Sequence, residues 1–421
     1  MNIFFSPLYL YFLFFSTTLF LYLFGPVDYV KVNTPGLVII LFTYKLFLLA
    51  GYIFAVQKFK FRPDEIDLSE SRESNILFKI IFIYSYLVLN LAIYTGFDFS
   101  AIFEFSEILI NALVNPLEVY QDSLDRSQLG GIYILILVLL SPLFYLILSN
   151  LLLSFGRLGI LYKVLIIIAL LLEFYKWTVM GRNKGVFEIV ILVSVVAYSL
   201  GKFKLIRGSQ KATSRKFLFT IMILVLVVGA LAYFDNALTA RKYAYEDYNR
   251  FDHLWLMQLV PDFLKSLVVN ITVYLAEGYR SLSLIMYENW TPMWGIGHST
   301  ILTENFSNIL SHDFYSYSYQ MKLSRYGIDP FVNWHSAYVW FANDFHWLGV
   351  SVVMFMIGYL FASSWMKFLK SGSNSEFVIF FFVVLSLVFL SGNTQVFNQT
   401  VSTVSFWSIL AYSRVVKRLK F

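Results

Sequence analysis

The stretch IFFSPLYLYFLFFSTTLFLYLF, residues 3–24, is apolar along its length and carries no charged side chain. A helix of about 20 residues is long enough to cross the roughly 30 Å hydrocarbon core of a bilayer, and runs of this kind recur along the whole chain. Only helices and closed barrels span lipid, and alternating ten-residue strands are absent. The sequence therefore predicts an all-α, polytopic integral membrane protein. Residues 3–24 lack a basic start and a small-residue cleavage site, so they are expected to be a spanning helix and not a signal peptide.

The composition agrees with this fold class. Of 421 residues, 58% are hydrophobic and only 14% are charged, and the mean hydropathy is +0.68. A soluble domain of this composition would have too little polar surface. The absence of cysteine excludes disulfides, thiolate metal sites and a cysteine nucleophile. The pI near 9.1 does not indicate nucleic-acid binding, because the basic residues concentrate in short loops, as membrane topology requires.

We predict ten spans, and loop charge orients them. The segments KFKFRPDEIDLSESRE (58–73), KFKLIRGSQKATSRK (202–216) and RVVKRLKF (414–421) are basic at their membrane-proximal ends or throughout. Basic loops stay in the cytoplasm, which places both termini there. The ten predicted spans are residues 3–24, 36–56, 76–96, 131–150, 159–175, 185–201, 217–234, 344–366, 376–392 and 399–413.

This topology divides the chain into three parts. Residues 1–234 form a transmembrane bundle of about seven spans, residues 235–343 form one large outer loop, and residues 344–421 form a bundle of about three spans with a basic tail. We find no internal repeat, which argues against transporters built from inverted repeats.

The middle of the large loop, FLKSLVVNITVYLAEGYRSLSLIMY (263–287), is apolar but interrupted by Lys265, Asn270, Glu277 and Arg280. Charges of this kind destabilise a free-standing span by several kcal/mol. We therefore predict one or two helices packed on the bundle at its outer face. A re-entrant hairpin is the alternative.

A first group of cations lies in the short loop FYKWTVMGRNKGVFE (174–188). Lys176, Arg182 and Lys184 fall on the outer side, where cations are disfavoured. Arg182 and Lys184 come just before a predicted span, and a helix N-terminus is a ready anion site. A guanidinium can grip phosphate with two hydrogen bonds. The alternative is that these cations reach toward lipid headgroups.

A second group lies in the large loop. The segment LTARKYAYEDYNRFDHLW (238–255) places Arg241 and Arg250 among tyrosines, and aromatic rings beside polar groups suit sugar faces. The alternative is a solvated, self-paired surface. Glu277 and Arg280 follow at a spacing of three, so they could pair along one helix. The Pro/Gly/Trp turn ENWTPMWGIGHST then reaches His298.

The stretch DPFVNWHSAYVWFANDFHWLG (329–349) runs straight into an apolar span. A neutral imidazole at His335 can accept a proton from a hydroxyl. Asp344 shares a helical face with Trp340, but the alternative is that it only caps the helix that starts there. One interpretation of His346 is a histidine packed at the membrane interface.

These motifs resemble a known family. VMGRNKGVFEIVILVSV resembles the "G-x-R followed by a span" element of the O-antigen polymerase and O-antigen ligase superfamily, and NWHSAYVWFANDFHWLG resembles its "H-N/S-x-Y … (D/E)-x-G-x-x-G" element. YLAEGYRSLSL and MWGIGHS are similar to a segment of oligosaccharide repeat-unit polymerases. The resemblance covers about residues 175–350. The sequence departs from the family pattern at His346, because the pattern has its first glycine there, after the Asp or Glu that Asp344 matches.

The resemblance implies roles for particular residues. Arg182 would hold the diphosphate of a polyprenyl-linked glycan, and His335 would lie at the reacting centre. Arg280, with Arg241 or Arg250, would neutralise the leaving diphosphate, because fixed cations in a poorly solvated cleft stabilise such charge strongly. No Asp/Glu pair resembles a divalent-metal site, so we expect an inverting single displacement without a metal or other cofactor. The remaining substrate-binding candidates are Lys184, Glu277, His298 and Asp344.

The expected function is polymerisation of undecaprenyl-diphosphate-linked repeat units on the periplasmic face of a bacterial inner membrane. The resemblance implies a GT-C-like membrane glycosyltransferase fold. It also implies lipid-linked glycans as donor and acceptor, membrane lipids as surroundings, and a co-polymerase that sets chain length. The nearest alternative is the ligase that moves finished glycan onto lipid A-core. A flippase would want more charges inside its spans, where Lys45 and Glu173 are among the few. A structural scaffold is the remaining alternative.

Overall fold

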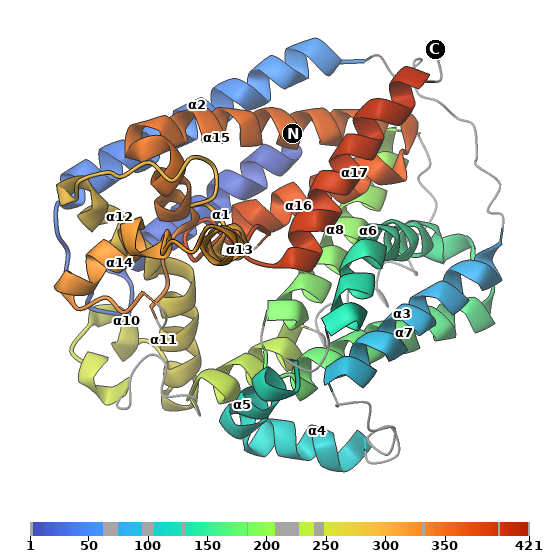
Figure 1. Ribbon diagram of the computed structural model, residues 1–421, viewed down its shortest axis with the longest axis horizontal. Helices are drawn as coiled ribbons and strands as arrows, with labels where there is room; N and C mark the ends of the chain where they lie inside the picture. The colour runs from blue at the N-terminus through green and yellow to red at the C-terminus, as the bar shows by residue number, and fades with distance from the viewer. Residues whose placement is uncertain are drawn as a thin grey trace. The chain divides into compact units, whose positions relative to one another are not determined.

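The protein is all-helical, as the sequence predicts. In the computed structural model the described part of the chain consists of helices joined by turns and connections and contains no strand (Figure 1). Contacts divide the chain into two compact units. The first comprises residues 1–61, 247–370 and 379–406, and the second comprises the remainder. The residues described are 3–61, 75–94, 105–127, 131–182, 184–206, 227–239, 248–330, 333–394 and 396–419.

Six helices within these residues are long and apolar enough to cross a membrane. They are α1 (Ser6–Phe24), α2 (Thr34–Phe59), α3 (Ile76–Tyr94), α6 (Gly131–Ser154), α8 (Lys184–Ile206) and α15 (Ala337–Ser371). Three other predicted spans coincide with helices that are shorter or more polar, namely α7 (Ile160–Val179), α16 (Asn374–Val388) and α17 (Thr400–Leu419). Of the predicted span 217–234 the structure describes residues 227–234, which are helical. The apolar helices are those of a multi-pass membrane protein. The count of ten spans, their orientation and the three-part division by side of the membrane stay predictions.

In the first unit, α2 and α15 pack closely through two glycines. A Cβ on Gly51 of α2 would lie 2.0 Å from the backbone oxygen of Phe355, and a Cβ on Gly358 of α15 would lie 2.0 Å from that of Leu48. Small residues let helix backbones approach in membranes, where close packing drives association. Any larger side chain at either position would push these helices apart.

Lys45 ties three helices of this unit together. It is only 3% exposed, and its Nζ donates to the hydroxyl of Tyr11 on α1 and, at 2.5 Å, to that of Tyr338 on α15. It also lies 4.3 Å from the centroid of the Phe15 ring. Hydrogen bonds of this kind satisfy the polar group of a buried lysine side chain. One of the few charges in the predicted spans therefore holds the start of α15 in place.

The large loop folds into short helices that pack on the same unit. Helix α11 (Asp262–Ala276) contacts α1, and α12 (Gly278–Leu284) contacts α2. These contacts agree with the predicted packing of this segment on the bundle, and its place at the outer face stays a prediction. The other helices of the loop are η5 (Tyr248–Phe251), α10 (Trp255–Gln258), η6 (Ile285–Tyr287), α13 (Thr300–Leu310), η7 (Tyr315–Tyr317), α14 (Tyr319–Lys322) and η8 (Leu323–Tyr326).

The predicted start of the eighth span, near residue 344, lies close to a kink at His346 that separates two helices within α15. Helix α15 begins at Ala337 and bends at His346, whose backbone is non-helical with φ 59° and ψ 156°. The apolar run begins at the bend, but the polar residues ahead of it are also helical because their side chains bond to other segments. Asp344 is therefore inside the helix and does not cap its start.

The second unit contains the helices between α3 and residue 239. Helix α3 packs on α6 and α7, and α7 packs on α8. The rings of Tyr86 and Phe144 stack at 4.4 Å, and Lys79 Nζ donates to Asn150 Oδ1 at 2.6 Å. Two shorter helices, α4 (Phe105–Val114) and α5 (Pro116–Ser127), cover part of this bundle.

Candidate functional site

Three segments of the first unit meet where α11 joins α12. They are this junction, residues 333–337 ahead of α15, and residues 389–399 between α16 and α17. Gly278 has no room for a Cβ, because backbone atoms of the other two segments lie 2.1 Å and 2.6 Å from that position. The N–H of Ala337 donates to the carbonyl of Leu390 at 2.9 Å, which joins those two segments to each other. We call this meeting point the junction site.

Glu277 is the residue between α11 and α12. Its Oε1 accepts a hydrogen bond from Asn333 Nδ2 at 3.0 Å. The residue is partly exposed as a whole, but its Oε2 is enclosed and has no hydrogen-bond partner among the described residues. Burial raises the pKa of Glu277 to about 7, against the opposing effects of Asn333, the backbone of Trp334 and the charge of Arg280. Near neutral pH this carboxyl group therefore exists both with and without its proton.

Arg280 follows one turn later. The structure shows no ion pair between Glu277 and Arg280, so the alternative of simple pairing along a helix is not what the described residues form. The guanidinium Nη2 donates instead to the carbonyl of Tyr326 at 3.5 Å. Its charge remains close enough to lower the pKa of Glu277. The junction site thus carries a carboxyl group and a cation that do not neutralise each other by direct contact.

His335 lies on the second segment and is 3% exposed. Neither ring nitrogen has a hydrogen-bond partner of normal geometry within the described ranges. Burial lowers the pKa of His335 to about 4, against the opposing backbone and charge of Asp329. The imidazole is therefore neutral at pH 7, with one nitrogen able to donate and the other to accept. An enclosed polar atom without a partner costs about 1–3 kcal/mol, which favours a bound group that supplies one.

The third segment contributes polar residues that sequence reasoning missed. Asn393 Oδ1 and Thr394 Oγ1 are also enclosed without a partner among the described residues, as is Ser336 Oγ on the second segment. A signal for them exists in the sequence. The polar run SGNTQVFNQ, residues 391–399, separates the last two apolar stretches.

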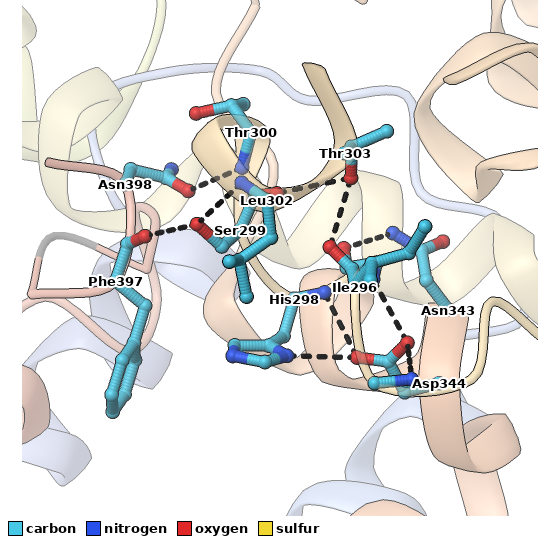
Figure 2. A network of polar contacts seen from close by, with 12 residues as sticks. Ile296, His298, Ser299, Thr300, Leu302, Thr303, Asn343, Asp344, Phe397 and Asn398 are labelled. Atoms are coloured by element: carbon cyan, nitrogen blue, oxygen red, sulfur yellow. Dashed lines mark hydrogen bonds and ion pairs between the residues drawn. The ribbon is translucent and has the colours of Figure 1, made fainter. Parts of the chain in front are cut away.

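A second polar network fixes the loop of residues 289–299 to α15 (Figure 2). Asp344 Oδ1 accepts the N–H groups of Gly295 at 2.8 Å and Gly297 at 2.9 Å. Its Oδ2 accepts the N–H and the ring Nδ1 of His298, both at 2.9 Å. The carboxylate side chain is 1% exposed. The structure thus brings the predicted residues His298 and Asp344 together, with Asp344 as the anchor of an irregular loop.

The neighbouring Asn343 completes this anchor. Its Oδ1 accepts the N–H of Tyr319 at 2.8 Å, and its Nδ2 donates to the carbonyl of Gly297 at 2.9 Å. Ser299 Oγ donates to the carbonyl of Phe397 at 2.5 Å (Figure 2). The loop is therefore fastened both to α15 and to the segment 389–399 that enters the junction site.

His346 stands where the resembled family has a glycine, and its backbone takes the conformation that glycine prefers. Its φ of 59° with ψ of 156° belongs to a region that is essentially restricted to glycine. Its ring lies 5.5 Å from that of Trp290 and 5.0 Å from that of Trp347. A glycine at this position would adopt the same backbone conformation without strain.

We expect His346→Gly to raise the melting temperature by about 2 °C, because relief of roughly 1–3 kcal/mol of backbone strain outweighs the lost ring contacts. His346→Ala is the matched control, since it removes the same ring but keeps a Cβ. Thermal unfolding followed by intrinsic fluorescence in detergent measures both. A His346→Gly protein that melts no higher than His346→Ala would refute the strain argument.

The predicted phosphate-binding cations lie in the second unit. Helix α8 begins at Lys184, which confirms that Arg182 and Lys184 sit at a helix start. However, Lys184 forms an ion pair with Glu188 at 3.3 Å, and Lys176 forms one with Glu173 at 2.5 Å. Two of the three cations are thus already paired with carboxylates.

The two remaining arginines are less informative. Arg250 is exposed at η5, and its guanidinium lies 4.7 Å from the centroid of the Phe251 ring. Arg241 lies outside the described residues. Of the predicted site, the junction therefore gathers Glu277, Arg280 and His335.

Within the described ranges, no three His, Asp or Glu side chains are placed to hold a metal ion together. Comparisons of this chain with protein-family models, curated proteins and solved structures give no match. The fold and the site together define a helical membrane protein with an enclosed acid–base group beside a cation.

Proposed function

We propose that this chain is a membrane glycosyltransferase that joins polyprenyl-diphosphate-linked repeat units, as the O-antigen polymerases that its motifs resemble do. One observation carries the proposal. Glu277 and His335 lie on two segments that meet at Gly278, and each has an enclosed polar atom without a partner among the described residues. Titratable groups kept unpaired and enclosed are typical of sites that bind and react with a ligand.

In the proposed reaction, a hydroxyl oxygen of the acceptor sugar attacks the anomeric carbon of the donor. Its proton passes to Oε2 of Glu277. The bond from the anomeric carbon to the diphosphate oxygen breaks, and the electron pair leaves with the diphosphate. Arg280 stabilises that negative charge, which it can do strongly in a site that excludes water.

This assignment changes one role from the sequence-based expectation. A base works best when its pKa lies near the working pH. Glu277, with a pKa of about 7, fits that requirement better than His335, with a pKa of about 4. His335 then orients the acceptor hydroxyl through a hydrogen bond. The role of Arg182 in holding diphosphate rests on the resemblance.

The setting of the reaction is part of the same proposal. The enzyme lies in a bacterial inner membrane with both termini in the cytoplasm, and residues 235–343 lie in the periplasm. The fold is GT-C-like. The growing chain is the donor, the incoming lipid-linked unit is the acceptor, and a co-polymerase in the membrane sets the chain length.

The lipopolysaccharide profile of a deletion strain on a silver-stained gel tests this function. We expect core that carries a single repeat unit and no ladder, because export and ligation survive when polymerisation is lost. Complementation with the wild-type gene restores the ladder.

Other profiles would contradict the proposal. Bare core without any repeat indicates a ligase or a flippase, and periplasmic accumulation of long lipid-linked polymer then identifies the ligase. An unchanged ladder excludes an O-antigen polymerase and directs attention to capsule or exopolysaccharide.

A further inference from the structure

We propose that Asn393 and Thr394, on the connection between α16 and α17, bind hydroxyl groups of the acceptor sugar and select it. This inference rests on the proposed function and adds side chains of a third segment to the proposed substrate site at the junction. Neither residue belongs to the motifs that carry the family resemblance.

The connection between α16 and α17 is placed by its contact with Gly278. The carbonyl oxygen of Ser391 lies 2.1 Å from the place where a Cβ of Gly278 would be, so the connection touches the residue next to Glu277. Consecutive Cα atoms are 3.8 Å apart. The Cα atom of Asn393 therefore lies within about 8 Å of that of Ser391, and the Cα atom of Thr394 within about 11 Å.

Asn393 and Thr394 each carry an enclosed polar side-chain atom. Thr394 is 3% exposed. Its Oγ1 and the Oδ1 of Asn393 have no hydrogen-bond partner among the described residues. Nearly all enclosed polar groups in folded proteins have a partner. Two such atoms, on a connection that touches the junction site at Gly278, indicate a ligand that supplies several partners at once.

The donors and acceptors that lack partners indicate the chemical class of that ligand. A phosphate would require donors only, and a cation would require acceptors only. The unpartnered atoms here are mixed: Asn393 Oδ1 accepts, the hydroxyl of Thr394 both donates and accepts, and the neutral ring of His335 does the same. Mixed donors and acceptors match the hydroxyl groups of a sugar, each of which also donates and accepts. Arg280, at the same junction, is left for the charged diphosphate.

Binding of two lipids to the purified full-length protein in nanodiscs tests the proposal. One probe is the lipid-linked repeat unit extracted from the deletion strain, and the other is undecaprenyl diphosphate without sugar. We expect Asn393→Ala and Thr394→Val each to weaken binding of the sugar-bearing lipid about 5–10-fold, the equivalent of one lost hydrogen bond. Binding of undecaprenyl diphosphate stays unchanged.

Two further variants make the result specific. Thr394→Ser keeps the hydroxyl and is expected to bind the sugar-bearing lipid as the wild type does, whereas Thr394→Val keeps the shape and loses the hydroxyl. Asn305→Ala, at an exposed position on α13, is the control for a lost amide and leaves both affinities unchanged.

The outcomes separate this inference from the function on which it rests. If the wild type prefers the sugar-bearing lipid and the Asn393→Ala and Thr394→Val proteins keep that preference, the sugar-binding role of Asn393 and Thr394 is refuted and the proposed function stands. If the wild type binds both lipids equally, or binds neither, the proposed function falls and the inference falls with it.

Discussion

Glu277→Gln is expected to abolish polymerisation while leaving the protein folded. The amide has the shape of the protonated carboxyl group but cannot accept the proton of the acceptor hydroxyl. A positioned base contributes roughly 10²–10⁴-fold, so we expect a rate loss of about 100-fold or more. The wild-type rate should rise with pH through about 7, where Glu277 loses its proton, and the residual rate of the variant should not. The assay is release of undecaprenyl diphosphate from purified enzyme.

The same variant has a second expected effect, on stability. The folded-state pKa of Glu277 is about 7, above its ordinary value of 4.5. The folded state therefore binds the proton more tightly than the unfolded state, and stability is lost as pH rises from about 4.5 to 7. Up to about 3 kcal/mol is involved. Glu277→Gln should melt with the wild type at pH 4.5 and above it at pH 8.

Glu304→Gln, at an exposed position on α13, is the control and should match the wild type in rate and melting. A Glu277→Gln enzyme that keeps its rate within a few-fold would remove Glu277 from the proton transfer. Equal melting of the variant and the wild type at pH 8 would contradict the raised pKa.

Asp344→Asn is expected to release the loop of residues 289–299. The carboxylate accepts three backbone N–H groups and the ring of His298. A carboxamide has one acceptor oxygen, and its NH₂ group would face donors. Leaving such groups unpaired costs about 3 kcal/mol or more. We expect a fall in melting temperature of about 5 °C or more and faster chymotrypsin cleavage at the exposed Trp294.

Asp313→Asn provides the comparison, because Asp313 is exposed and its Oδ1 accepts one N–H, from Ser316 at 3.3 Å. We expect it to melt within about 1 °C of the wild type. If Asp344→Asn melts and cleaves as Asp313→Asn does, the anchoring role of Asp344 is wrong.

Much of the fold follows from the sequence because lipid imposes simple rules. Apolar runs of helical length predict helices, and the structure has a helix at each predicted span within its described residues. Helix starts are harder to predict. The predicted span from residue 344 matches the second of the two helices in α15, but the helix that begins at Ala337, ahead of the kink at His346, was not predicted. Its polar residues make long-range hydrogen bonds that no local pattern reveals.

In the candidate site, too, local sequence features could be predicted and long-range contacts could not. Sequence reasoning singled out Glu277, Arg280 and His335 because charged or titratable residues are rare in apolar surroundings. It assigned Lys184 to phosphate without seeing that Glu188, one turn away, pairs with it. It did not single out Asn393 and Thr394, because short uncharged polar connections are common and only the contact at Gly278 draws attention to this one.

The central claim is that this chain itself transfers glycans between lipid-linked units. The most direct measurement is incubation of the purified wild-type protein with the lipid-linked repeat unit, followed by separation of the products by length. The account predicts a ladder of lipid-linked polymers with one undecaprenyl diphosphate released for each bond formed, and no ladder with Glu277→Gln. A wild-type protein that binds this substrate and leaves it as single units would contradict the account.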